Sequence, residues 1–139
     1  MTDDTPMQVV CGLIFHGNRL LATRRDPKRH FPLLWEFPGG KLENGEMPED
    51  ALHRELEEEL QLKVEIVQEL PGVAYQGDGF RLKLLPFVCR IAQTAAPIPL
   101  DHVEIRWIEP EWADHLTWAP PDIPLIAQLN DLAPSIDHE

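Results

Sequence analysis

The sequence predicts a mixed α/β fold in which helices cover both faces of a central mixed β-sheet. Apolar, β-branched segments typical of strands are interspersed with helical segments, without a regular βαβ alternation. The 139 residues suffice for one domain with a hydrophobic core, and 43% hydrophobic with 26% charged residues is ordinary for a globular protein. No repeat, low-complexity tract or linker interrupts the chain. We therefore expect a single domain over residues 1–139, with its core at about 8–132.

The first half of the chain predicts a hairpin, two loops and a helix. Its β-branched apolar runs indicate strands, its Gly-Asn pair a turn, and Pro48 the first turn of the helix. We expect strands at 8–15 and 19–23 around a turn at 16–18, a long polar loop at 24–36, a second loop beginning at 37–40, and a helix at 48–61. Loops as long as the first of these are often functional.

The second half predicts four further strands and two helices. Alternating Val and Ile residues indicate one strand, and a Gly-Asp-Gly turn joins the next two into a hairpin. We expect strands at 63–70, 73–76, 80–91 and 103–108, a short helix at 110–115, and a final helix that Asp122 caps and that ends near Leu132.

The overall charge restricts the class of partner. A net charge of −12 argues against a nucleic-acid polymer, which binds basic surfaces. The N-terminal residues lack the features of a signal peptide, and no apolar run reaches transmembrane length, so we expect a cytoplasmic protein without a membrane partner, either a monomer or a homodimer. Cys11 and Cys89 lie within apolar runs, which favours buried free thiols over a disulfide.

The helix at 48–61 carries the most informative pattern. Eight acidic residues fall within residues 43–59. At about 100° per residue, Glu55, Glu58 and Glu59 follow one edge of an apolar stripe formed by Leu52, Leu56 and Leu60. Like charges at these spacings repel each other, so a solvated acidic face is the weaker interpretation. Divalent cations with oxygen ligands would explain the cluster, which points to a magnesium enzyme acting on phosphates.

Three residues near the acidic cluster have candidate supporting roles. Arg54 stands four residues before Glu58 and could also reach the loop acid Glu46, so we expect it to orient the carboxylates. Gly40 allows close backbone approach, and its carbonyl could add a metal ligand, although a Gly-Gly pair alone can mark a plain turn. Lys41 could contact a phosphate or could be an ordinary exposed lysine.

The segment from Gly40 to Leu62 resembles the signature of the Nudix hydrolases, G-x5-E-x7-R-E-U-x-E-E-x-G-U, where U is a bulky aliphatic residue. The residues that match are Gly40, Glu46, Arg54, Glu55, Leu56, Glu58, Glu59 and Leu62. Gln61 stands where the signature has its last glycine. That glycine belongs to the exit of the helix, so the departure concerns backbone geometry more than chemistry.

Two further segments are similar to the MutT branch of this family, the nucleoside triphosphate pyrophosphohydrolases. They are WEFPGGK at 35–41 and APPDIPL at 119–125, the second resembling members that act on cytidine triphosphates and oxidised guanine nucleotides such as 8-oxo-dGTP. The resemblance covers residues 8–129 and implies an α/β/α sandwich. It also implies hydrolysis of a nucleoside triphosphate to a monophosphate and pyrophosphate.

The resemblance implies Mg²⁺ as the cofactor, which Mn²⁺ could replace. Its ligands would be Glu55, Glu58 and Glu59 with the Gly40 carbonyl, and Glu55 is also a candidate to activate the attacking water. Asp101, six residues before Trp107, is expected to complete the site in preference to Glu104. Both acids could instead be ordinary surface residues.

Base and phosphate recognition have several candidates. Asp122 stands where some relatives read the purine edge with an asparagine, and its competing role is the helix cap. Phe37 and Phe80 could stack on a base, as could Tyr75, although strand aromatics usually belong to the core. Arg24 and Arg25 match the branch in place and could contact phosphate, or form an exposed basic turn.

Two other functions compete with triphosphate hydrolysis. One is a Nudix hydrolase for coenzyme A or ADP-ribose, but Leu33 replaces the glycine expected of the first, and Gly77-Asp78 replace the proline that marks the second. The other is a non-catalytic nucleotide-binding domain, against which the complete set of Glu55, Glu58 and Glu59 argues.

Overall fold

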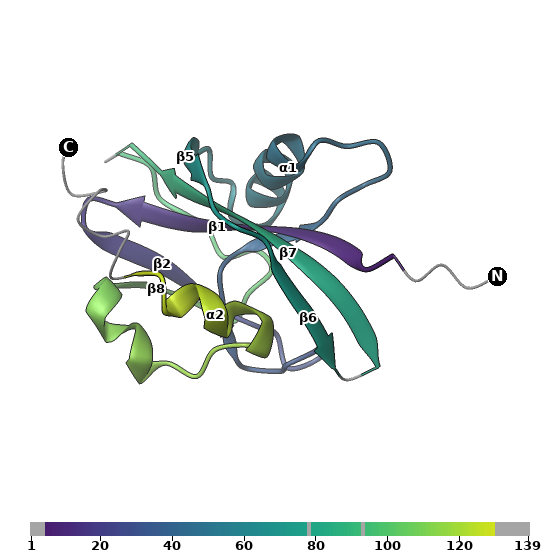
Figure 1. Cartoon of the computed structure of the whole chain (residues 1–139). Helices are drawn as coiled ribbons and strands as arrows, with labels where there is room; N and C mark the ends of the chain where they lie inside the picture. The colour runs from purple at the N-terminus through teal and green to yellow at the C-terminus, as the bar shows by residue number, and fades with distance from the viewer. Residues whose placement is uncertain (1–4, 78, 93, 130–139) are drawn as a thin grey trace.

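The computed structural model describes residues 5–77, 79–92 and 94–129, and within them an eight-stranded sheet carries helix α1 on one face and the remaining helices on the other (Figure 1). In chain order the elements are β1 (Met7–His16), β2 (Arg19–Arg24), β3 (Trp35–Glu36), β4 (Gly39–Lys41), α1 (Pro48–Leu60), β5 (Glu65–Glu69), β6 (Val73–Gly77), β7 (Phe80–Arg90), β8 (Glu104–Ile108), η1 (Pro110–His115), η2 (Pro120–Asp122) and α2 (Ile123–Ile126). The predicted fold class is confirmed.

The centre of the sheet is the parallel pair β1 and β7, which runs from Met7 opposite Leu82 to Phe15 opposite Arg90. All other pairings are antiparallel, so the sheet is mixed, as predicted. The second edge of β1 is shared, because β4 lies beside its first half and β2 beside its last two residues. This division places the glycines of β4 in the middle of the molecule, next to α1.

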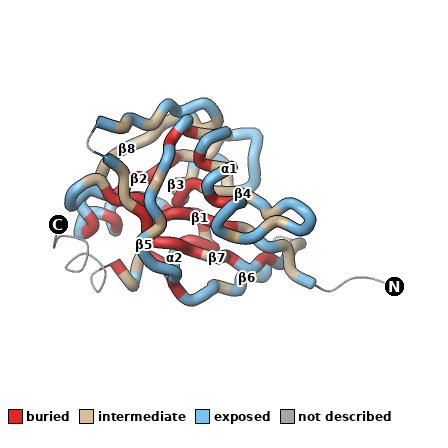
Figure 2. Tube along the Cα trace, turned by 90° about the horizontal axis from the view of Figure 1, so that it is seen from above, coloured by how far each residue is buried: buried red, intermediate tan, exposed pale blue. Residues whose placement is uncertain are grey.

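Buried residues form two layers, one on each face of the sheet, with the most buried positions along β1 and β7 (Figure 2). On one face, the leucine stripe of α1 packs on Val10, Ile14 and Phe87. On the other face, Leu125 and Trp118 pack on alternate residues of β1. Each fully buried leucine of this kind contributes about 1.5–3 kcal/mol to stability.

The two ends of helix α1 relate differently to the sequence: its start follows the usual preferences, whereas its exit has Gln61 in place of a glycine. Pro48 begins it and Glu49 and Asp50 lie in its first turn, where negative charge complements the helix dipole. Gln61 adopts the left-handed conformation, with φ of 49°, and donates its N–H to the Glu57 carbonyl. A non-glycine residue there costs roughly 1–2 kcal/mol. The exit therefore keeps the geometry of the signature glycine despite the substitution.

The two cysteines are buried and free, as predicted. Cys11 faces the layer with Trp118, whereas Cys89 faces the layer with α1, so the sheet separates the two thiols. No helix in the described part of the chain is both long and apolar enough to span a membrane.

The structure corrects several expected boundaries. The short strands β3 and β4 fall within segments expected to be loops, because backbone hydrogen bonds pair them with β2 and β1. The short helix at 110–115 is a 3₁₀ helix. The final helix is described only as Ile123–Ile126, and its expected end near Leu132 lies outside the described residues. The turn of the second hairpin includes Asp78, which also lies outside them.

Candidate active site

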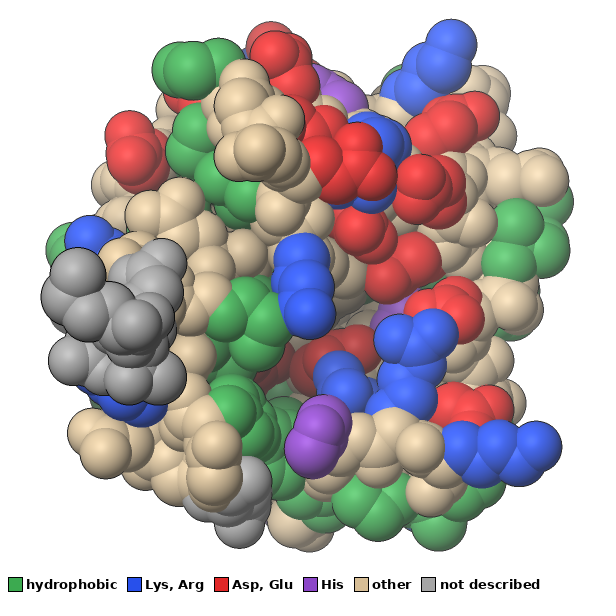
Figure 3. Space-filling model, turned by 90° about the vertical axis from the view of Figure 1, so that its right-hand side faces the viewer, with side chains coloured by type: hydrophobic (Ala, Val, Ile, Leu, Met, Phe, Trp, Pro, Cys, Tyr) green, Lys and Arg blue, Asp and Glu red, His purple; other side chains and the backbone are tan. Residues whose placement is uncertain are grey.

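Acidic side chains gather on one rim of a hollow in the surface, and basic side chains on the opposite rim (Figure 3). The cavity has a volume of about 390 Å³. It is lined by parts of β1, β4, α1, the start of β7, the loop after β2 and the segment around η2. The predicted site residues on its walls are Arg25, Phe37, Gly40, Lys41, Glu55, Glu59, Phe80 and Asp122.

Arg54 holds the outer part of the acidic face together. Its Nε and Nη2 atoms donate to the two oxygens of Glu46, at 2.8 and 2.9 Å. Its Nη1 atom lies 3.0 Å from Oε1 of Glu55 and 3.3 Å from Oε2 of Glu58, and Nη2 also donates to the Lys41 carbonyl. The hydrogen bonds from Arg54 lower the pKa of Glu46 to about 2. The orienting contacts expected of Arg54 are thus present.

Gly40 lies so close to the carboxylate of Glu55 that a side chain at this position would clash with it. A Cβ atom on Gly40 would lie 2.3–2.5 Å from the carboxyl atoms of Glu55. A Cβ atom on Gly39 would lie 1.9 Å from the Val10 carbonyl oxygen, across the β1–β4 pairing. The Gly-Gly pair is therefore needed for close packing, which agrees with the approach predicted from the sequence.

Glu59 is the exceptional member of the cluster. Its Oε1 atom is buried and has no hydrogen-bond partner among the described residues. Burial, followed by the charges of Glu36, Glu55 and Asp101, raises the pKa of Glu59 to about 9. A buried carboxylate without a partner is costly, and a bound cation would remove that cost.

The donor set fits a divalent cation, because carboxylate oxygens are its preferred ligands and one of them has no partner. Within residues 5–77, 79–92 and 94–129, however, no three Asp, Glu, His or Cys side chains already converge as a metal site. Arg54 holds Glu55 and Glu58 in ion pairs, and Glu58 is largely exposed to solvent. Cation binding would therefore require these side chains to turn toward Glu59.

Asp122 lies at the inner end of the cavity and is only 5% exposed. Its Oδ2 atom accepts the N–H of Phe37 at 2.7 Å. Asp122 stands at the N-cap position of α2, as predicted, but its side chain makes no capping hydrogen bond there. Burial, and then the charge of Glu36, raises its pKa well above the usual range. Burial and the charge of Glu36 therefore favour the protonated form of this carboxyl group.

The aromatic candidates differ in their surroundings. Phe37 is buried and its ring lies 4.7 Å from that of Trp118, so most of it belongs to the core. Phe80 is only partly buried and packs within 5.2–6.0 Å of the rings of His30, Phe31 and Tyr75. His30 and Phe31 also line the cavity, and the loop after β2 supplies both of them. The aromatic wall is thus larger than the sequence indicated.

Glu36 and His102 were missed as candidates. Glu36 lines the cavity, forms an ion pair with Arg25, and lies 3.0 Å from Nε2 of His102. The His102 side chain is 2% exposed, and its Nδ1 atom has no partner within the described residues. Glu36 lies inside the WEFPGGK segment, and His102 directly follows Asp101. These positions beside predicted site residues were the sequence signals that could have identified Glu36 and His102 as candidates.

Arg24 and the two acids near β8 do not line the cavity. Arg24 donates to the Leu33 carbonyl and lies 3.5 Å from Glu104, so it points away from the expected phosphate position. Glu104 also pairs with Arg106. Asp101 pairs with Arg29 at 2.7 Å, and its charge contributes to raising the pKa of Glu59. Of the two acids, Asp101 is the one whose charge acts on the glutamates of α1.

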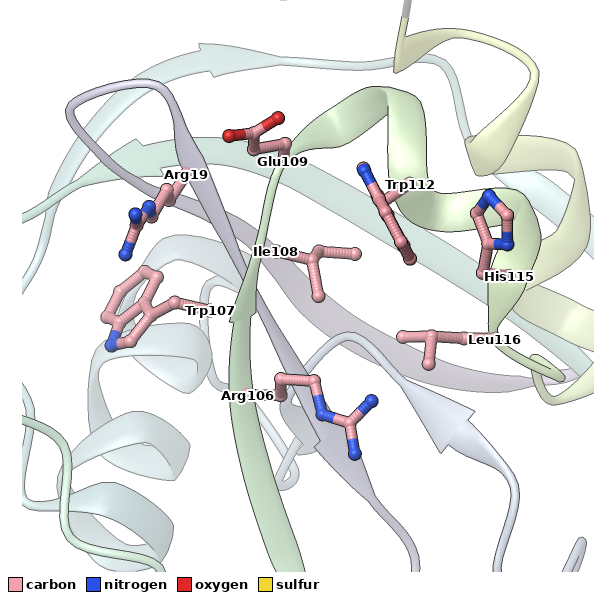
Figure 4. Close-up of a pocket in the computed structure, with 8 residues that line it drawn as sticks. All are labelled: Arg19, Arg106, Trp107, Ile108, Glu109, Trp112, His115 and Leu116. Atoms are coloured by element: carbon pink, nitrogen blue, oxygen red, sulfur yellow. The ribbon is translucent and has the colours of Figure 1, made fainter.

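A second cavity of about 560 Å³ lies between β8 and η1 and includes the exposed Trp112 (Figure 4). Among the described residues that line it, Glu109 is the only acid and none is a predicted site residue. The chemistry expected from the sequence therefore belongs to the smaller cavity.

Comparison with known proteins identifies the family to which this chain belongs. Residues 5–129 match the family described as NUDIX domain. The CTP pyrophosphohydrolase of Escherichia coli strain K12 is 30% identical over 124 residues, covering 86% of this chain and 88% of that protein. The 8-oxo-dGTP diphosphatase of Proteus vulgaris is 43% identical over 77 residues, covering 54% and 68%. Matches to two further 8-oxo-dGTP diphosphatases span 43% of those proteins.

A solved structure agrees with the sequence matches. The solution structure of the MutT protein from methicillin-resistant Staphylococcus aureus 252 superposes with a TM-score of 0.74 at 32% identity, covering 91% of this chain and 97% of that one. The family match includes the entire acidic helix and the strands that support it. The chain belongs to the Nudix hydrolase family, in its MutT-like branch.

Proposed function

We propose that this protein is a Mg²⁺-dependent pyrophosphohydrolase that converts nucleoside triphosphates to monophosphates and pyrophosphate. Mn²⁺ is expected to replace Mg²⁺. The observation that carries the proposal is the buried oxygen of Glu59, which has no partner among the described residues, on the wall of a cavity that Glu55 and Gly40 also line. A bound cation would offset the cost of burying this oxygen. A substrate whose phosphates carry a metal ion would bring such a cation to the site.

The metal would be held by Glu55, Glu58 and Glu59, with the Gly40 carbonyl and Asp101 as further ligands. When bound, it would neutralise phosphate charge and lower the pKa of a coordinated water. Glu55 is the candidate to orient the attacking water, since it lies on the cavity wall and Arg54 fixes one of its oxygens.

Phosphate and base would be recognised by different walls. Lys41 and Arg25 line the cavity and are suited to contact phosphate oxygens. Phe80, with His30 and Phe31, supports stacking of a base. A protonated Asp122 could donate one hydrogen bond in addition to accepting from Phe37. Oxidised guanine and cytosine both carry carbonyl oxygens, and relatives named for each are similar to this chain.

The proposal is tested by measuring pyrophosphate release from the normal triphosphates, 8-oxo-dGTP, ADP-ribose and coenzyme A, with and without Mg²⁺. We expect metal-dependent release of one pyrophosphate per monophosphate from at least one triphosphate. Cleavage of ADP-ribose or coenzyme A in preference to every triphosphate would contradict it, as would equal rates in excess chelator.

A further inference from the structure

Arg29, on the wall of the cavity, forms an ion pair with Asp101. Its Nη2 atom lies 2.7 Å from Oδ1 of Asp101, and the two side chains are 51% and 35% exposed. Arg29 lines the cavity, whereas Asp101 does not. The guanidinium group is therefore paired with one of the proposed metal ligands.

The backbone on both sides of this pair is fixed by other contacts. On the side of Arg29, the backbone N–H groups of Leu33 and Leu34 donate to the carbonyls of Arg25 and Phe31. These bonds hold the loop after β2, which carries Arg29. On the other side, Leu100 donates its backbone N–H to the carbonyl of Glu59, at 3.0 Å. None of these bonds involves the side chain of Arg29 or Asp101. The ion pair can therefore separate by side-chain rotation while both loops stay in place.

The pair is poorly suited to persist when a metal is present. An ion pair between exposed side chains is weak, because water and salt screen it. A carboxylate bound to a divalent cation is held more strongly and cannot keep a full interaction with Arg29. The other cavity arginine, Arg25, is already held by Glu36 and the His30 carbonyl. Arg29 is thus the cavity arginine that metal binding would release.

We propose that Arg29 is the resting counter-ion of Asp101 and exchanges this carboxylate for the phosphate chain of the substrate when the metal site fills. This role rests on the proposed function. It makes Arg29 a phosphate-binding residue that competes with the metal in the empty enzyme and assists the metal once substrate is present. A purely structural role would not produce these opposite effects.

The test uses the full chain with Arg29→Ala and, as a matched control, Lys28→Ala, which removes the same charge from the neighbouring exposed position. Mn²⁺ binding without nucleotide is measured by electron paramagnetic resonance. We expect Arg29→Ala to tighten Mn²⁺ binding roughly two- to fivefold, the scale of an exposed ion pair. The same variant should raise KM for the best triphosphate roughly tenfold, the scale of a charge-assisted hydrogen bond. Lys28→Ala should change neither value.

Combining Arg29→Ala with Asp101→Asn identifies the partner. In the Asp101→Asn background, the tightening of Mn²⁺ binding by Arg29→Ala should shrink, because the carboxylate it competes for is gone. Weaker or unchanged Mn²⁺ binding in Arg29→Ala would overturn the proposal, as would an unchanged KM or an effect equal to that of Lys28→Ala. Arg29→Gln gives the same readouts if the alanine variant folds poorly.

Failure of the proposed function would look different. In that case wild-type protein would release no pyrophosphate from any triphosphate, while the Mn²⁺ titrations of the two variants would still report whether Arg29 and the cation compete.

Discussion

The two walls of the cavity treat their acids differently. On the wall opposite α1, Glu36 is paired with Arg25 and His102, and Asp122 accepts a backbone N–H. On the α1 wall, Arg54 pairs with the outer glutamates, but the inner oxygen of Glu59 has no partner among the described residues. The acids named on the first wall therefore all have partners inside the protein, and so do Glu55 and Glu58. The Glu59 oxygen is the exception, and under the proposed function it is the oxygen most in need of a bound cation.

The largest effect should come from removing the carboxylate of Glu59. We expect Glu59→Gln to lower kcat about 10³-fold, since several kcal/mol of transition-state stabilisation depend on a correctly held metal. The fold should survive, because an amide is cheaper to bury there than a carboxylate. Circular dichroism and steady-state kinetics would check both statements.

Glu57→Gln is the matched control for Glu59→Gln, because Glu57 is an exposed glutamate of the same helix. It should retain wild-type turnover. Glu58→Gln should also reduce turnover severely. Wild-type rates in the Glu58 or Glu59 variants would remove those residues from the ligand set.

The second test is the pH dependence of stability without metal. The pKa of Glu59 rises from 4.5 to about 9 on folding, so the folded protein binds more protons than the unfolded chain between these values. Stability from this group is therefore fully present below pH 4.5 and is lost as pH rises toward 9, by at most about 1.4 kcal/mol per pH unit.

Chemical denaturation at pH 6 and pH 8.5 would measure this loss. Glu59→Gln should flatten the profile, and Mn²⁺ should restore stability to the wild type at pH 8.5 but not to this variant. If the free energy of unfolding of the wild type changed with pH as little as that of Glu59→Gln, folding would not raise the pKa of Glu59.

A smaller effect is expected from the residue that orients the outer acids. Arg54→Ala should lower kcat by about 10–100-fold, the usual range for a group that supports metal ligands. Arg54→Lys should recover little of this loss, because one ammonium group cannot reproduce the contacts with Glu46, Glu55 and Glu58. Full activity in the lysine variant would mean that charge alone is required.

The smallest effect on rate is expected at Asp122. Asp122→Asn should change the ranking of triphosphates by roughly tenfold in kcat/KM, because an amide offers a different pair of donor and acceptor groups. It should keep the contact to the Phe37 N–H, which Asp122→Ala would lose. A substrate ranking identical to that of the wild type would leave Asp122 a support for Phe37 only.

The α1 wall could be predicted from the sequence because one helix carries most of it. The spacing of Glu55, Glu58 and Glu59 against the leucine stripe fixes their direction as soon as the helix is recognised. Arg54 and Gly40 were found by the same local pattern. The central strands were also predictable from their apolar runs, with boundaries within about two residues.

Several residues of the opposite wall were predicted, but their pairing could not be, because the wall is assembled from residues far apart in the sequence. Glu36 and His102 meet across 66 positions, and Asp122 meets Phe37 across 85. Asp122 had the local signature of a helix cap, but its burial against the Phe37 N–H gave it another role. Arg24 and Arg25 are adjacent and chemically alike, yet only Arg25 lines the cavity, where it pairs with Glu36, whereas Arg24, the last residue of β2, lies beside Glu104.

The most direct test of the central claim is Mn²⁺ binding to the protein without nucleotide, measured by electron paramagnetic resonance at pH 8 for wild type, Glu59→Gln and Glu57→Gln. We predict saturable binding to the wild type and to Glu57→Gln, with affinity at least about tenfold weaker in Glu59→Gln. Equal affinity in all three proteins would contradict the claim that the Glu59 carboxylate holds the metal.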